Sequence, residues 1–163
     1  MEKVLISACL LGKKVRYDGK TLPVSDNLIE HWMAQRRVIA VCPEVDAGMS
    51  IPRAAAEISA GDGHDVLAGI AKVVTESGDD VSKDFTKGAQ LALALCQQYD
   101  IKVAVLSESS PSCGSSNIYD GSFTRRKIAG LGVTVALLRQ HGIEVFNQHQ
   151  LQRASQVLER TRT

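Results

Sequence analysis

The sequence predicts an α/β fold, a single-domain, three-layer Rossmann-like arrangement with a mostly parallel sheet. Three short apolar runs, at residues 3–7, 37–42 and 102–106, are typical of strands that are buried on both faces. Between these runs, residues 26–36 and 82–99 have apolar residues at helical spacing, with an Asp and a Ser at their starts as candidate N-caps. This alternation, with short links, favours parallel strands joined by right-handed crossovers.

The last third of the chain continues the same alternation. Residues 131–140 have the pattern of a helix that ends at His141 and Gly142, where a left-handed C-cap is expected. A fourth strand at 143–146 and a closing helix at 147–160 follow. We therefore expect four parallel strands and at least four covering helices.

Residues 46–78 fit this pattern least well. They mix Gly, Pro and Ala before a candidate strand at 70–74, and we interpret the segment as a mobile, lid-like excursion. The tripeptide Tyr-Asp-Gly occurs twice, at 17–19 and 119–121, each time after a cysteine-containing stretch. Both copies are explained equally well by Asp-Gly turns and by a shared role at a functional site.

Composition narrows the classes of function. The chain has 163 residues, 44% of them hydrophobic, which suits one domain spanning residues 1–163. Nineteen basic and eighteen acidic residues leave a net charge of +1, so no nucleic-acid partner is expected. The apolar N-terminal stretch is too short for a signal peptide or membrane span, which predicts a cytoplasmic protein without membrane partners. Four cysteines without a CxxC pair favour reduced thiols.

Three of the cysteines occupy equivalent positions in the predicted topology. Cys9 follows the first strand, Cys42 ends the second, and Cys113 lies in the loop after the run at 102–106. In parallel sheets, ligands bind beyond the carboxyl ends of the strands, so we expect these thiols to converge there. Cys96 lies within a helical pattern and is assigned to the core.

Three converging thiols without a fourth favour an iron–sulfur cluster. A structural zinc site takes four ligands, usually in paired short spacings, and neither CxxC nor a nearby histidine occurs here, so zinc is the less favoured alternative. A [4Fe-4S] cluster is normally held by four cysteines. Three would leave one iron with an exchangeable position that can act as a Lewis acid.

The loops around the thiols supply candidate catalytic groups. Glu44, in the stretch CPEV, is the best candidate for an acid or base, although a surface glutamate after a strand is the plain alternative. Ser110, in SPSCG, is the preferred catalytic hydroxyl, although serines in such turns commonly satisfy backbone groups. We predict both as catalytic residues.

Three further residues are candidates for substrate binding. Ser7 precedes Cys9, Ser112 precedes Cys113, and Arg53 could reach a substrate carbonyl or anion. An exposed Arg53 that pairs with Glu57 at i,i+4 is an equally good interpretation. The basic triplet at 125–127 is most simply a solvated surface, and its role is left open.

The motifs also resemble a known family. With SACLLGKKVRYDG, CPEV, IPRAAAEI, VSKDFTKGA, SPSCG and IYDGSF, the chain resembles the bacterial iron-sulfur thiouracil desulfidase family, formerly a domain of unknown function, through most of its length. The resemblance implies that Cys9, Cys42 and Cys113 hold a [4Fe-4S] cluster whose fourth iron takes the substrate sulfur. It also implies that Glu44 and Ser110 assist catalysis. The chain departs from the family in DAGMSIPRAAAE and TRRK, both of which could line the substrate pocket, so the substrate's identity stays open.

The leading hypothesis is a non-redox desulfidase acting on a thiolated heterocycle such as thiouracil. Water activated by Glu44 would replace the sulfur, which leaves as hydrosulfide, while Ser110 orients the water or moves a proton. One alternative is an enzyme with Cys113 as nucleophile in thiol or phosphate transfer, which leaves Cys9 and Cys42 unexplained. Another is a non-catalytic sensor that binds a cluster or zinc. The sequence does not indicate an oligomeric state.

Overall fold

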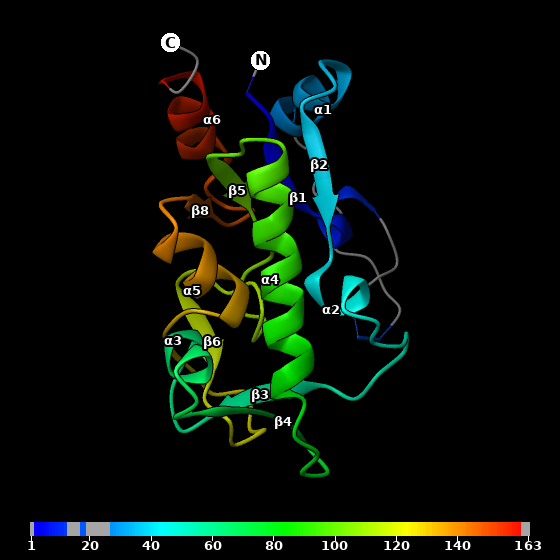
Figure 1. Cartoon of the computed structure of the whole chain (residues 1–163), viewed down its shortest axis with the longest axis vertical. Coiled ribbons are helices and arrows are strands. Elements are labelled where there is room, and N and C mark those ends of the chain that lie inside the picture. The colour runs from blue at the N-terminus through cyan, green and yellow to red at the C-terminus, as the bar shows by residue number, and fades with distance from the viewer. Residues whose placement is uncertain (1, 13–16, 19–26, 161–163) are drawn as a thin grey trace.

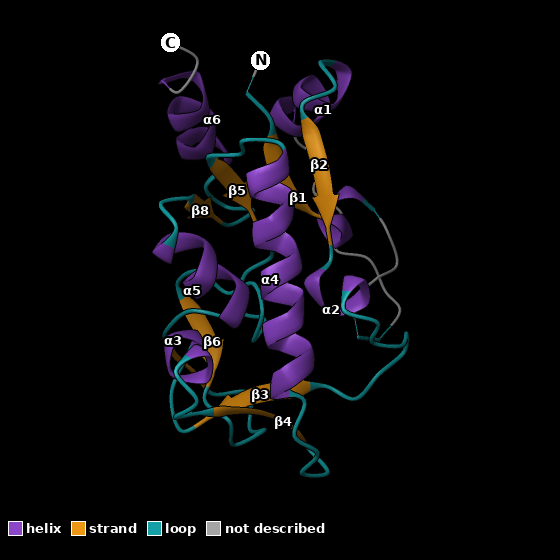
Figure 2. Ribbon diagram, in the orientation of Figure 1, coloured by secondary structure: helices purple, strands orange, loops and turns teal. Residues whose placement is uncertain are grey.

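A parallel sheet with strand order β2-β1-β5-β8 organises the computed structural model, which describes residues 2–12, 17–18 and 27–160 (Figures 1 and 2). The strands are β1 Val4–Ser7, β2 Val38–Val41, β5 Val103–Val105 and β8 Glu144–Phe146. Both neighbours of β1 run parallel to it, with Ser7 opposite Val41 and Ile6 opposite Val105. Because β1 lies between β2 and β5, the chain segments that follow these three strands leave from neighbouring points of one sheet edge.

Helices cover both faces of this sheet because successive side chains of each strand point to opposite sides. Val4 and Ile6 pack with α1 (Asn27–Ala34) and α6 (Leu151–Arg160). Leu5, between them, packs with α4 (Ser82–Gln98) and α5 (Val133–Gln140). The predicted α/β architecture with a helix layer on each face of a parallel sheet is therefore confirmed.

The predicted elements of this framework lie within a few residues of the observed ones. Gly142 has the expected left-handed conformation, with φ 79°, at the end of α5. The start of the first predicted helix, at residue 26, lies outside the described residues. Ser82 does not cap α4 as expected, because Val81 occupies the N-cap and the Ser82 hydroxyl instead accepts a hydrogen bond from the Val73 N–H at 2.9 Å.

The prediction of a mobile excursion over residues 46–78 is wrong for most of that segment. It contains β3 (Ala56–Ser59), α3 (Gly63–Leu67) and β4 (Lys72–Thr75), and β3 pairs antiparallel with β4. Ile58, Val66 and Val73 are buried with Phe85 of α4, and this apolar contact orders the segment. The Asp62 and Asp65 side chains form a capping box at the start of α3.

The smallest elements were not expected from the sequence. A second antiparallel pair, β6 (Asn117–Tyr119) and β7 (Lys127–Ala129), carries the basic triplet near its turn. Two short helices follow strands directly: η1 (Ala8–Leu11) after β1 and α2 (Pro43–Asp46) after β2. Elements of three or four residues are too short to show a period. Within the described ranges, no helix has both the length and the apolar character needed to cross a bilayer.

Helix α4 runs from the β3–β4 pair along the parallel sheet, as the long green helix of Figure 1 shows. It approaches α2 closely at Gly88, where a Cβ would lie 2.3 Å from the carbonyl oxygen of Pro43. Only a residue without a side chain fits this contact. Because Pro43 follows Cys42, the contact also fixes the chain beside one of the three thiols.

Gly88→Ala should destabilise the protein by about 1–3 kcal/mol, because the added methyl group collides with backbone that cannot move freely. In an exposed helix interior the same change would stabilise, since Ala has the higher helix propensity. The free energy of unfolding, measured with urea, checks this prediction. Gln90→Ala, at an exposed position of the same helix, is the matched control and should be neutral or slightly stabilising. Equal stability of Gly88→Ala and the wild type would contradict the contact.

Candidate active site

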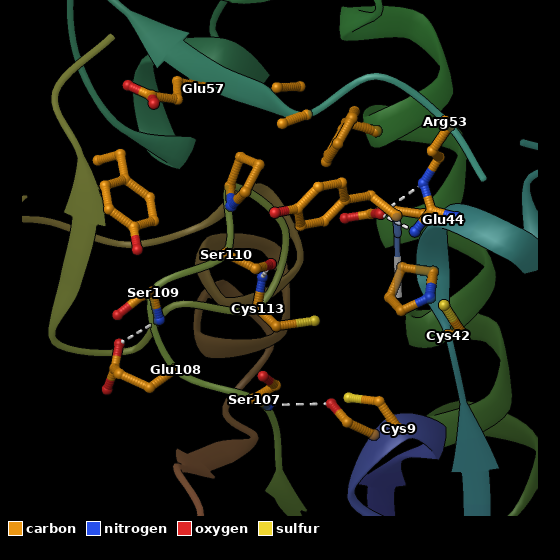
Figure 3. A pocket seen from close by; sticks show the side chains of 18 of the residues that line it. Cys9, Cys42, Glu44, Arg53, Glu57, Ser107, Glu108, Ser109, Ser110 and Cys113 are labelled. Atoms are coloured by element: carbon orange, nitrogen blue, oxygen red, sulfur yellow. Dashed lines mark hydrogen bonds and ion pairs between the residues drawn. The ribbon is translucent and has the colours of Figure 1, made fainter. Parts of the chain in front are cut away.

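A cavity of about 760 Å³ opens at the carboxyl ends of β1, β2 and β5 (Figure 3). Its wall includes Ser7 at the end of β1, Val41 at the end of β2, and Ser107 just after β5. Ligands of open parallel sheets bind at such a place, where strands on either side of a central strand lead into different loops. The topology alone thus identifies this edge as the candidate site.

All three predicted thiols line this cavity. Cys9 lies in η1, Cys42 directly precedes α2, and Cys113 lies in the segment of residues 107–116 after β5, here called the ligand loop. In Figure 3 the three sulfur atoms point into one shared space. Cys96 is buried between α4 and the sheet and is not part of the wall. The structure therefore brings together the three cysteines selected from the sequence and leaves the fourth in the core.

Burial keeps two of these thiols protonated in the absence of a metal. It strongly raises the pKa of Cys113; the Ser112 hydroxyl lowers this pKa and the Glu44 carboxylate raises it further. The pKa of Cys42 is also raised, chiefly by burial. A catalytic cysteine nucleophile needs a lowered pKa, whereas a metal ligand loses its proton to the bound cation. The environment of Cys113 thus favours a ligand over a nucleophile.

The donor set fits an iron–sulfur cluster. Thiolates are soft ligands that suit such clusters. In the part of the chain that the structure describes, no three His, Cys, Asp or Glu side chains form a group that could hold a metal ion. A [4Fe-4S] cluster takes one thiolate per iron, so its ligands surround a space and do not meet at a point. The three cysteines lie at three strand ends around one cavity, which matches ligands that surround a cluster and not ligands that meet at a single ion.

Glu44 lines the cavity and is fixed by Arg53. The Arg53 Nε donates to Glu44 Oε2 at 3.0 Å, and Nη2 donates to the same oxygen. Nη1 donates to the carbonyl of Ser50 at 3.1 Å. Both side chains of the ion pair are largely buried. Among the described residues Glu44 Oε1 accepts no hydrogen bond, so it is the oxygen left for a water or substrate. The alternative pairing of Arg53 with Glu57 is wrong.

Ser110 and Ser7 both line the cavity, with their oxygens already engaged as acceptors. Ser110 Oγ accepts from the N–H groups of Ser112 at 3.0 Å and Cys113 at 2.8 Å. A hydroxyl has two acceptor sites and one donor, so Ser110 retains its O–H to donate into the cavity. Ser7 Oγ accepts from the Ser107 N–H at 3.0 Å and thereby links the ends of β1 and β5.

Ser112 does not line the cavity, although the sequence suggested it as a substrate contact. Its side chain is buried and shares a hydrogen bond of 2.7 Å with the Thr134 hydroxyl. Its carbonyl accepts from the Thr134 N–H at 2.8 Å. These contacts attach the ligand loop to the start of α5. Ser112 therefore has a structural role in this loop, and we do not propose it as a substrate contact.

Sequence reasoning missed Glu108, whose carboxylate holds the ligand loop. Its Oε1 accepts hydrogen bonds from four backbone N–H groups, those of Ser109, Ser115, Ser116 and Asn117. Its Oε2 accepts from the Ser115 hydroxyl and the Asn147 side-chain amide. Burial raises the pKa of this carboxyl, but these hydrogen bonds outweigh it and leave the pKa below its ordinary value. The sequence shows an acidic residue after a strand and gives no sign of this role.

The far wall of the cavity comes partly from the stretches DAGMSIPRAAAE and TRRK, which the sequence indicated as candidate pocket lining. It is built from β3, β6 and the chain after β6, through Glu57, Tyr119, Phe123, Arg125 and Lys127. Two members of the basic triplet thus line the cavity, while Arg126 lies 3.7 Å from the Asp120 carboxylate instead. The tyrosines of both Tyr-Asp-Gly copies line the cavity. The repeat and the stretches DAGMSIPRAAAE and TRRK were the sequence signals that indicated this wall, whereas Phe123 was not singled out.

Glu108→Gln should weaken the pH dependence of stability. A carboxyl that is more acidic in the folded state stabilises folding above its unfolded pKa, and this contribution is lost as the pH falls through the lower folded pKa. At pH 7 the variant should therefore lose about 1 kcal/mol, at the low end for hydrogen bonds to a charged group because the carboxylate is partly open to solvent. Thermal unfolding at pH 7 and in acid measures the difference. A gap between the two proteins that is unchanged in acid would contradict this role.

Comparisons with known proteins agree with this geometry. The family model of the 2-thiouracil desulfurases matches residues 4–150. The uncharacterized protein YbbK of Bacillus subtilis (strain 168) is 42% identical over 148 residues, which are 91% of this chain and 97% of YbbK. The solved structure of the [4Fe-4S]-dependent thiouracil desulfidase TudS matches with a TM-score of 0.89 at 46% identity, covering 98% of this chain and 99% of TudS. This chain therefore belongs to the 2-thiouracil desulfurase family.

Proposed function

We propose that the protein is a [4Fe-4S]-dependent desulfidase, which hydrolytically removes sulfur from a thiolated heterocycle such as 2-thiouracil and releases hydrosulfide. The observation that carries this proposal is the convergence of three thiols from three adjacent strand ends on a cavity that also contains Glu44 and Ser110. Membership of the 2-thiouracil desulfurase family and the likeness to TudS support the reaction and the cofactor. Oxygen from water replaces sulfur at the same carbon, so no external oxidant or reductant is needed.

Cys9, Cys42 and Cys113 are the residues that would hold the cluster. When bound, the cluster would supply an iron with an open coordination position, which acts as a Lewis acid toward the substrate sulfur. The chain contributes thiols in a largely buried setting, where electrostatic interactions are stronger than in water. We also expect the protein to work in the reducing cytoplasm, because four cysteines without a CxxC pair favour reduced thiols.

Glu44 is the proposed general base. Its Oε2 is engaged by Arg53, which leaves Oε1 to accept a proton from the attacking water. Arg53 then acts on the reaction by orienting Glu44, to which both Nε and Nη2 donate. This assignment gives Arg53 a positioning role, beside the direct substrate contact that the sequence suggested.

Ser110 is the proposed hydrogen-bond donor to the substrate. Two loop amides engage its oxygen, so it donates its own proton toward the cavity without accepting a further one. A donor fixed in this way can stabilise negative charge that develops on the substrate as water adds. Ser7, beside Cys9, is proposed to form part of the substrate wall.

Replacing any one of the three cavity cysteines with Ser should remove most of the bound iron and the broad visible absorption band after anaerobic reconstitution. Cys96→Ala is the matched control and should keep both, because Cys96 lies in the core away from the cavity. Iron and sulfide assays together with the absorption spectrum measure the outcome. A colourless wild-type protein, or a Cys113→Ser protein with full iron content, would overturn the assignment.

Glu44→Gln should lower kcat for hydrosulfide release from 2-thiouracil by about 10²–10⁴-fold, the usual contribution of a positioned general base. The visible spectrum of the reconstituted protein should stay that of the wild type, because the substitution leaves the three thiols in place. Glu30→Gln, at an exposed position of α1, is the control and should keep full activity. Unchanged kcat in Glu44→Gln would exclude this residue as the base.

A further inference from the structure

The segment of residues 120–126 between β6 and β7, here called the wall loop, contributes to the wall of the cavity. Phe123 and Arg125 of this loop line the cavity, as do the flanking Tyr119 and Lys127. None of these side chains has a part in the chemistry proposed above. Their position suits contact with the body of a substrate whose sulfur points toward the thiols.

The wall loop has a backbone conformation that its side chains do not favour. Phe123 has φ 58° and Arg125 has φ 64°, in the left-handed region that residues with a Cβ rarely adopt. Such conformations persist only where surrounding contacts impose them, and they gather at functional sites. Something outside the loop must therefore hold it in place.

Glu57 supplies that contact from β3. Its Oε1 accepts hydrogen bonds from the N–H of Gly121 at 2.9 Å and of Phe123 at 3.2 Å. The residue is 9% exposed, so these bonds to a carboxylate are largely shielded from water. The loop also lies directly on β3 at Gly121, where a Cβ would lie 2.7 Å from the carbonyl oxygen of Ile58.

Glu57 is not placed to act in the reaction itself. Oε1 is committed to two loop amides, and Figure 3 shows Glu57 well apart from Cys9 and Cys42. Glu57 itself lines the cavity, and its two hydrogen bonds also connect it to the wall loop. Phe123 is the loop side chain suited to an aromatic heterocycle, because aromatic rings attract one another beyond the area that they bury.

We propose that Glu57 is a positioning residue that fixes the wall loop, and that Phe123 on this loop determines the affinity for the heterocycle. The nature of the ligand rests on the proposed function, whereas the hold of Glu57 on the loop does not. The two parts are therefore tested by different measurements.

The first measurement is amide hydrogen exchange in the protein as purified, with no substrate or turnover. Glu57→Ala should speed exchange in peptides spanning the wall loop by about tenfold, which corresponds to about 1.4 kcal/mol. Glu57→Gln should have a smaller effect, because its amide oxygen still accepts a hydrogen bond. The ligand loop should exchange as in the wild type, and the exposed Glu144→Gln is the control. Unchanged exchange in the wall loop of Glu57→Ala would overturn the positioning role.

The second measurement is the kinetics of hydrosulfide release from 2-thiouracil. Glu57→Ala and Phe123→Ala should each raise KM by about tenfold, with kcat and the visible spectrum unchanged, and the double variant should be no worse than either single one. Such non-additivity shows that Glu57 acts through Phe123. Additive effects on KM, or an equal loss of kcat and of kcat/KM, would overturn the proposal.

The outcomes separate the two claims. If the wild type releases no hydrosulfide, the proposed function fails, and equilibrium dialysis of 2-thiouracil then replaces KM as the test of Phe123. Equal binding by wild type and Phe123→Ala would overturn its role. If the wild type is active but wall-loop exchange is the same in Glu57→Ala, the function stands and the positioning role fails.

Discussion

The parallel pairing of β1 with β2 on one side and β5 on the other is the constraint on which the site depends. It sends three carboxyl ends to the same sheet edge, so thiols at residues 9, 42 and 113 meet at one cavity although they are far apart in the chain. Apolar side chains on both faces of these strands hold the pairing, through the two helix layers that bury them. The chemistry of the site therefore rests on an apolar framework that takes no part in it.

The cavity has a proposed reacting end beside the thiols and a proposed recognition end at the wall loop, and in each a carboxylate binds loop amides. At the reacting end, Glu108 accepts hydrogen bonds from backbone amides of the ligand loop, and the Ser110 hydroxyl accepts one from the amide of Cys113. At the other end, Glu57 holds the wall loop. Glu44 differs from both, because its partner is the side chain of Arg53 and not a set of loop amides. A carboxylate that binds loop amides fixes the loop, whereas Glu44 is held by another side chain and keeps Oε1 for the proton transfer proposed above.

Local patterns in the sequence were sufficient for the framework. Runs of apolar residues and helical spacing predicted the four parallel strands and the principal helices, because burial imposes its period on each element. Three cysteines placed at or after the ends of strands indicated a common site, because the carboxyl ends of parallel strands lie at the same edge of the sheet. The quoted motifs gave a family resemblance that the comparisons confirm. They also gave Glu44 and Ser110, whose catalytic roles stay predictions.

Only the tertiary structure decided which partner each polar group has. The sequence could not show that Arg53 binds Glu44 and not Glu57, that Ser112 turns to Thr134, or that residues 56–75 form an ordered β-α-β unit. These outcomes depend on which chain segments pack together, and a carboxylate looks the same in the sequence whether it meets an arginine, an amide or water. By itself the sequence determined the elements of the parallel framework, their order and the thiols. Packing across distant segments determined the partners, because hydrogen bonds and ion pairs form between groups that only folding brings within reach.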